Sequence, residues 1–293
     1  MGVSRRPLPL LTLALACALG ALLVWLAAFT LPLGQRLDGS ALAAFGVVAQ
    51  PRLEPSINGV ASLANLLPLI VMATVLVGIA LLRRRWLMAG LVPLILLAAN
   101  IFTQLAKPGL AHPRIVELSG IEGVYPASWP SGHSTVAMSL ALCAVLVAGP
   151  RLRPLAAVLG AAYAISVGYS LVALGFHLPS DVLGGFLVAA TFTLLGAAAL
   201  ARLEAPQPQP QPRTAVAPAQ REDRGSSGPG ALVTAAVAAL TTLVLVGLAL
   251  LAHHPRAADY AGGNPAAVLA AVAIAGLGVA LTASLTLALR SDR

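Results

Sequence analysis

The sequence predicts an all-α, polytopic membrane protein, in which a bundle of six core helices is followed by two extra C-terminal transmembrane helices. The first observation is composition: of 293 residues, 58% are hydrophobic and only 10% are charged. An ordinary soluble domain carries about 25% charged residues. A soluble globule of this length could not bury so much apolar surface. The composition therefore argues against a soluble enzyme, a disordered chain and a small disulfide scaffold.

The second observation is a series of apolar segments long enough to cross a bilayer, which takes about 20 mostly apolar residues. The first segment follows Arg5-Arg6 and is longer than the apolar region of about 7–15 residues in a signal peptide, so we interpret it as a retained anchor. The fourth segment is short. The eight predicted spans are Leu8–Leu33, Val60–Leu82, Trp86–Ala106, Ser134–Ala148, Pro154–Leu174, Ser180–Ala201, Ala231–Ala252 and Ala266–Leu289.

The third observation is the distribution of Lys and Arg between the predicted loops. With the N-terminus inside, 13 of the 18 cations fall on the inner side and five on the outer side. Membrane proteins concentrate these residues in cytoplasmic loops. We therefore expect a multi-pass plasma-membrane protein with both termini cytoplasmic. The net charge of +8 follows from this bias and indicates no nucleic-acid partner.

Composition also divides the chain. We expect an N-terminal transmembrane anchor helix and outer loop at 1–57, a core at 58–202, a Pro/Gln/Gly-rich cytoplasmic linker at 203–230 and a transmembrane helix pair at 231–293. Cys17 and Cys143 lie in apolar runs without a Cys-x-x-Cys pair, which argues against a structural zinc site. Gly276 and Gly278 in the last helix could support a homo-oligomer.

Polar residues collect in three groups at helix ends, all on the predicted outer side: 107–114, 129–134 and 170–181. Ionisable groups at the ends of apolar helices are costly, so they are candidates for function. In the first group, Lys107 and Arg114 would make a site for an anion such as phosphate. The alternative is that both side chains only reach to the lipid headgroups.

The second group leads directly into the fourth predicted span. Ser131 suits a helix N-cap, and Gly132 allows close approach to the backbone. The free N–H groups of such a helix start suit a phosphate oxygen. The alternative is an ordinary helix start in which His133 is incidental.

In the third group, His177 and Asp181 are four residues apart. If the next helix begins near 178–180, the Asp181 carboxylate can reach one imidazole nitrogen. The other nitrogen would then be left to attack or to transfer a proton. Asp181 is the only acidic residue that the sequence places in or at the edge of an apolar span. The alternative is an Asp that only caps the helix.

Taken together and in this order, the three groups resemble the type 2 phosphatidic acid phosphatase superfamily of membrane lipid phosphatases, acid phosphatases and haloperoxidases. The resemblance covers about residues 58–201. Lys107 and Arg114 have the family spacing, the stretch 130–133 reads Pro-Ser-Gly-His, and Ser170, His177 and Asp181 fall in register. Two residues depart from the pattern: Ile115 stands where the family has Pro, and Leu171 stands where the third motif has Arg.

The resemblance implies a role for each matched residue. His177 would be the nucleophile that forms a phosphohistidine, Asp181 would orient it, and His133 would protonate the leaving group. The phosphate oxygens would be held by Lys107, Arg114, Ser131 and the amide of Gly132. Neither a metal nor a cofactor is implied.

The resemblance further implies an integral-membrane lipid phosphatase that acts on a lipid phosphate or diphosphate monoester, polyprenyl or phosphatidic-acid-like, at the extracytoplasmic face. Two alternatives stay open at this point. The same intermediate could pass its phosphate to another alcohol, which would make the protein a phosphotransferase. A catalytically degenerate protein that binds a lipid phosphate would also fit, and Leu171 motivates that alternative.

Overall fold

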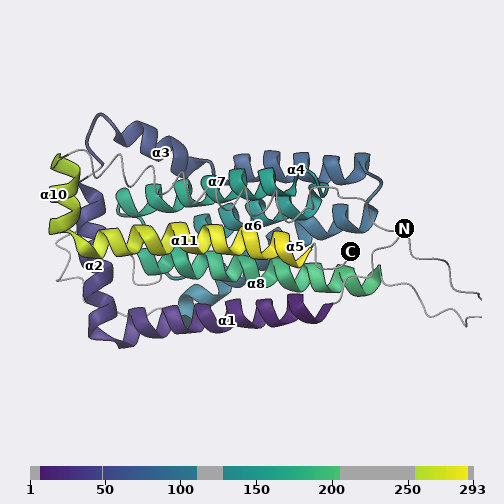
Figure 1. Ribbon diagram of the computed structural model, residues 1–293, viewed down its shortest axis with the longest axis horizontal. Coiled ribbons are helices and arrows are strands. Elements are labelled where there is room, and N and C mark those ends of the chain that lie inside the picture. The colour runs from purple at the N-terminus through teal and green to yellow at the C-terminus, as the bar shows by residue number, and fades with distance from the viewer. Residues whose placement is uncertain (1–6, 48, 111–127, 205–254, 290–293) are drawn as a thin grey trace, which may run out of the picture.

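The computed structural model describes residues 7–47, 49–110, 128–204 and 255–289, and within these residues it is helical without strands (Figure 1). The predicted all-α fold class is confirmed. The predicted span 231–252 and Arg114 lie outside the described residues. The helices are α1 (Pro7–Thr30), α2 (Pro32–Gly46), α3 (Glu54–Ser62), α4 (Leu66–Leu82), α5 (Trp86–Leu110), α6 (Gly132–Val147), α7 (Arg153–Ala173), α8 (Pro179–Leu203), α10 (Pro255–Gly263) and α11 (Pro265–Ala288).

Each predicted span within the described residues is occupied by apolar helix. Among the described residues, five helices, α1, α5, α7, α8 and α11, are long and apolar enough to cross a membrane, and the bent pair of α3 and α4 is so when the two are taken together. The helix α6 has 16 residues, which at 1.5 Å per residue is shorter than a hydrocarbon core of about 30 Å. Thirteen of its residues are buried, so α6 is enclosed by protein and need not match the bilayer thickness.

The centre of the bundle is formed by α6 and α8. Helix α8 packs against α1, α5 and α6, and α6 also packs against α7, while α11 covers α7 (Figure 1). In α8, 67% of the span is buried, against 22% in α1. The two helices that follow the second and third polar groups are therefore the most enclosed, and their N-termini lie at the same end of the bundle.

At that end, α2 lies across the bundle, and α10 lies beside it (Figure 1). The chain breaks after Thr30, and Pro32 starts α2, as proline suits the first turn of a helix. Helix α2 contacts α1, α7, α8 and α11, and the hydroxyl of Tyr260 in α10 donates to the carbonyl of Ala44 in α2. The sequence analysis predicted an outer loop here, but the structure has a helix that covers the bundle end.

The second predicted span is broken rather than continuous. Helices α3 and α4 meet at an angle of 48° over residues 63–65. Pro68 explains the break, because it has no N–H to donate to the carbonyl of Ala64 and its ring would clash with that carbonyl in a continuous helix. The hydroxyl of Tyr163 in α7 donates to the carbonyl of Leu63 at 3.0 Å and so ties the break to the bundle.

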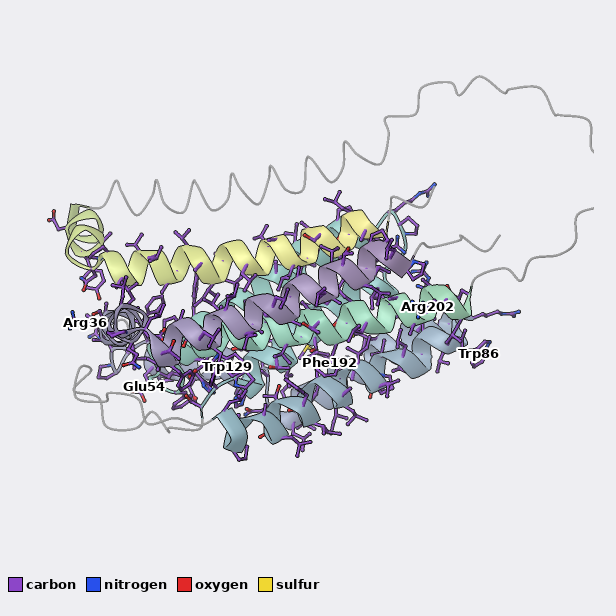
Figure 2. All side chains as sticks on the ribbon, turned by 90° about the horizontal axis from the view of Figure 1, so that it is seen from below. Arg36, Glu54, Trp86, Trp129, Phe192 and Arg202 are labelled. Atoms are coloured by element: carbon purple, nitrogen blue, oxygen red, sulfur yellow. The ribbon has the colours of Figure 1, made fainter. Side chains whose placement is uncertain are left out.

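At the opposite end, arginine side chains cap helix C-termini. Arg83 Nη1 donates to the carbonyl of Val147 at 3.0 Å, and Arg85 Nη1 donates to that of Leu146 at 3.1 Å. Cations near a helix C-terminus satisfy its free carbonyls and oppose its dipole. Figure 2 shows the two ends: Arg36 and Glu54 lie at the α2 end, and Trp86 and Arg202 lie at the opposite end.

Candidate active site

His177 lies in the tight turn that joins α7 to α8 at the α2 end. Gly175 has φ of 74°, a left-handed conformation that favours glycine, and it turns the chain back. The N–H groups of Phe176 and His177 both donate to the carbonyl of Leu171, at 3.0 and 3.3 Å. Pro179 then begins α8. The turn fixes the backbone of His177 four residues after the end of α7.

As the spacing predicts, the carboxylate of Asp181 reaches the His177 ring. Nδ1 of His177 lies 3.3 Å from Oδ2 of Asp181, and the same oxygen accepts the N–H of Leu178 at 3.1 Å. The Asp181 side chain is fully buried and that of His177 is 12% exposed. A buried carboxylate must be hydrogen-bonded. The arrangement favours a proton on Nδ1, which leaves the Nε2 lone pair for chemistry.

The N-terminus of α6 is bonded directly to the N-terminus of α8. The N–H of Ser131 donates to the carbonyl of Asp181 at 3.0 Å. Oγ of Ser131 accepts the N–H of Ser134 at 3.3 Å, so the predicted N-cap is present. The stretch Pro-Ser-Gly-His and the His-Asp pair therefore form one structural unit, although about 50 residues separate them.

Two glycines allow this close approach. A Cβ on Gly185 would lie 2.7 Å from the carbonyl oxygen of Ser131, and a Cβ on Gly184 would lie 2.5 Å from Nε1 of Trp129. Atoms at these distances would overlap. Only glycine at both positions lets the first turns of α8 lie against the segment that starts α6, which is why the dipeptide follows Asp181.

Lys107, in the last turn of α5, lies beside the start of α6. A Cβ on Gly132 would lie 3.8 Å from Nζ of Lys107 and 3.3 Å from Nε2 of Gln104. The positive charge of Lys107 interacts electrostatically with His133 and with Asp181. Gln104 was missed by the sequence analysis, although its position three residues before Lys107 puts both on one helix face.

His133, in the first turn of α6, is within electrostatic range of both His177 and Lys107. Its Nε2 lies 2.9 Å from Oδ1 of Asn65, at the break between α3 and α4. The structure thus brings Lys107, Ser131, Gly132, His133, His177 and Asp181 together at one end of the bundle. Asn65 was not predicted from the sequence. A single polar residue in an apolar segment gives no indication of a partner that lies 68 residues away.

A second acidic residue, Asp38 of α2, also contacts the start of α8. Oδ1 of Asp38 in α2 accepts the N–H of Ser180 at 3.0 Å, and its Oδ2 accepts the hydroxyl of Ser180. A carboxylate at a helix N-terminus is favoured by the free N–H groups and the helix dipole. No sequence signal pointed to this contact, because the segment of Asp38 was expected to be a loop.

Leu171, at the position of the motif Arg, brings no cation to the site. The Leu171 side chain is 1% exposed and packs in the apolar core. Arg36 is exposed on α2, two residues from Asp38, and residues two apart in a helix face different directions. Since Asp38 contacts α8, Arg36 does not lie on the face of α2 that contacts α8. The place of Arg114 relative to Lys107 stays a prediction.

Comparison with known proteins gives a family match and a structural match. The family model described as the PAP2 superfamily matches residues 88–204. Among solved structures, the chain is similar to one described as the first transmembrane PAP2 type phosphatidylglycerolphosphate phosphatase from Bacillus subtilis. The identity is 23% and the TM-score is 0.53, over 64% of this chain and 94% of that chain. No curated protein matches the chain.

The matched segment runs from α5 to the end of α8. It contains Lys107, the stretch 130–133, His177 and Asp181, which carry the resemblance in the sequence. Helices α1 to α4, α10 and α11 lie outside it. The resemblance seen in the three motifs is thereby confirmed over residues 88–204, which match the PAP2 superfamily model, and the chain is a multi-pass membrane protein with the fold of that solved structure.

Proposed function

We propose that this protein is an integral-membrane lipid phosphatase that hydrolyses a lipid phosphate or diphosphate monoester through a phosphohistidine at the extracytoplasmic face. The observation that carries the proposal is the buried Asp181, whose Oδ2 lies 3.3 Å from Nδ1 of His177, beside Lys107 and the N-terminus of α6. The similar solved structure is described as a phosphatidylglycerolphosphate phosphatase, which supports a lipid phosphate as the substrate class.

In the first step, the lone pair on Nε2 of His177 attacks phosphorus, and the bond from phosphorus to the leaving oxygen breaks. His133 gives a proton to that oxygen, so the product leaves as an alcohol or, from a diphosphate, as a phosphate monoester. Asp181 holds the proton on Nδ1 and stabilises the positive charge that develops on the His177 ring. The phosphoryl group is then bonded to Nε2.

In the second step, water attacks the phosphohistidine. His133, now neutral, takes a proton from the water, and the phosphorus–nitrogen bond breaks to release inorganic phosphate and restore His177. Lys107 and Arg114 oppose the charge on the non-bridging oxygens, and the hydroxyl of Ser131 and the N–H of Gly132 donate to them. These cations and donors supply the electrostatic stabilisation that phosphoryl transfer requires.

The position of the site in the bundle supports a lipid substrate. His177 and Ser131 lie at the N-terminal ends of α8 and α6, where a phosphorylated headgroup at the bilayer surface can reach them. The opposite end carries Arg83, Arg85 and Arg202. Since positive residues concentrate on the cytoplasmic side, the site would face outward. Polyprenyl phosphates and phosphatidic-acid-like lipids both present such a headgroup.

The direct test is phosphate release by the purified full chain in detergent with EDTA present. Phosphatidic acid, a polyprenyl phosphate and a polyprenyl diphosphate would be offered in parallel. We expect release from at least one of them and its complete loss in His177→Ala. Leu159→Ala, a change at an exposed position of α7, is the matched control and should keep wild-type activity.

The other outcomes separate the alternatives. Equal release by wild type and His177→Ala would contradict the nucleophile. Phosphate appearing on an added alcohol rather than in solution would identify a phosphotransferase. Saturable binding of the lipid phosphate without release of either product would identify a protein that only binds it.

A further inference from the structure

The break in the second span brings a polar side chain to His133. Asn65 is the N-cap of α4, with φ of −70° and ψ of 168°. Its Oδ1 lies 2.9 Å from Nε2 of His133. We infer that Asn65 is a positioning residue that fixes the ring of His133, and that the break between α3 and α4 is therefore part of the active site. The inference rests on the role proposed above for His133.

Two features hold Asn65 at a fixed place relative to the catalytic helices. Pro68 sets the position of the break along the chain, as described above. The hydroxyl of Tyr163 then ties the carbonyl of Leu63, two residues before Asn65, to α7 at 3.0 Å. Ala61 and Ala64 on either side of Leu63 are each 4% exposed and pack in the core. The break is thus anchored to the helix that leads into the turn of His177.

The chemistry of the two side chains decides which nitrogen of His133 does the work. The amide oxygen of Asn65 only accepts hydrogen bonds, so it requires a proton on Nε2 of His133. In the charged ring, the second proton is then on Nδ1 and is the one that can pass to the leaving oxygen. After the transfer, the ring is the neutral Nε2–H form, which Asn65 continues to stabilise. In the second step, Nδ1 takes the proton from water.

The two histidines would then carry their fixed proton on opposite ring nitrogens. Asp181 holds the proton of His177 on Nδ1 and leaves Nε2 to attack, whereas Asn65 holds the proton of His133 on Nε2 and leaves Nδ1 to transfer. A neutral amide suits the second case. Within the part of the chain that the structure describes, the charges that act on His133 come from Lys107 of α5 and His177 of the α7–α8 turn. The neutral amide orients the ring without cancelling their charge at the phosphate site.

A pair of substrates with different leaving groups tests the inference. General acid catalysis contributes about 10²–10⁴-fold, and it matters for the alkoxide of phosphatidic acid but little for p-nitrophenolate. We expect Asn65→Ala to lower kcat/KM on phosphatidic acid about 10- to 100-fold, up to the lower end of that range. Because kcat/KM reports the formation of the phosphohistidine and not the water step that both substrates share, kcat/KM on p-nitrophenyl phosphate should stay nearly unchanged. The double variant Asn65→Ala/His133→Ala should be no slower than His133→Ala. Asn58→Ala, an exposed asparagine in α3, should resemble wild type.

A second measurement does not depend on activity. In protein labelled with ¹⁵N-histidine, the His133 signals are identified by their loss in His133→Ala. We expect the neutral ring to carry its proton on Nε2 in wild type and to lose that preference in Asn65→Ala, with an unchanged melting temperature. An Nδ1–H ring in wild type would overturn the inference, and so would an equal loss of kcat/KM on both substrates. Failure of the proposed function would instead appear as phosphate release that survives His177→Ala.

Discussion

Asp181 combines complete burial with two hydrogen bonds to a single carboxylate oxygen. Oδ2 accepts from Nδ1 of His177 and from the N–H of Leu178, while the backbone carbonyl of the same residue accepts from Ser131. One residue therefore orients the proposed nucleophile and joins the two helix N-termini that frame the site. Its side chain and its backbone can be tested separately, because a substitution changes only the first.

Asp181→Asn should remove the charge while keeping the shape. An amide that turns its NH₂ toward the imidazole favours the wrong tautomer, and the same change lowers kcat about 10⁴-fold in the Ser-His-Asp triad. We expect a loss of at least about 10³-fold in phosphate release by the same mechanism, with little change in melting temperature. Activity within a few-fold of wild type would contradict the role of the carboxylate.

Asp38→Ala should act mainly through the start of α8. The change leaves the N–H and hydroxyl of Ser180 without their acceptor in a site where Ser180 is 7% exposed. Leaving a buried donor unsatisfied costs about 1–3 kcal/mol. We expect a lower melting temperature in detergent, and reduced activity because His177 and Asp181 flank this residue. Asp259→Asn, at an exposed position of α10, is the control and should change neither quantity.

The residues that sequence reasoning found and missed differ in the distance to their partners along the chain. His177 and Asp181 were predictable because four residues make one helical turn. Asn65 and Asp38 were not, because their partners lie 68 and 142 residues away and only the packing of whole helices brings them together. Long-range hydrogen bonds leave no periodic signal in a single sequence.

At the scale of helices, the contact between α6 and α8 depends on glycine. Gly185→Ala should force the two helices apart, because its Cβ would lie 2.7 Å from a backbone oxygen of Ser131, which cannot rotate away as a side chain can. Overpacking of this kind costs about 1–3 kcal/mol. We expect a lower melting temperature and reduced phosphate release. Gly276→Ala in α11, where a Cβ meets nothing within 4 Å, should change neither the melting temperature nor phosphate release. An equal effect of both substitutions would refute the packing argument.

Hydropathy predicted the long helices well, since a bilayer demands apolar segments of a set length. It did not predict α2, because Pro32–Gly46 buries only part of its surface across the bundle end and has no transmembrane pattern. It also joined α3 to α4, because apolar residues continue on both sides of the break. Pro68 is a local sign of that break, but the hydropathy alone predicted a continuous span.

For the whole molecule, the proposed function requires the site end to face outward. Both native cysteines, Cys17 and Cys143, are buried. Single cysteines can therefore be added to a protein whose own thiols are shielded from the reagent. We expect Ser40→Cys, at an exposed position of α2, to react with a membrane-impermeant maleimide on intact cells. Glu204→Cys, at the end of α8, should react only after permeabilisation. The reverse pattern would contradict the orientation deduced from the positive residues.

The sparse charge of the molecule serves distinct purposes at its two ends. Arg83 and Arg85 cap the C-terminus of α6, and they contribute to the excess of positive charge on the side predicted to be cytoplasmic. Lys107 lies instead at the site end, beside Gly132. Counting cations predicted the two sides of the membrane but not these contacts, because a count contains no information on which carbonyl or phosphate a side chain reaches.

The central claim is that His177 carries the phosphoryl group, and trapping the intermediate tests it most directly. The full chain would be mixed with a ³²P-labelled lipid phosphate that it hydrolyses, quenched in alkali, digested and mapped by mass spectrometry. We predict label on His177 that is stable in alkali and lost in acid, and no label in His177→Ala. Continued turnover with no labelled protein, or with label on another residue, would contradict the account.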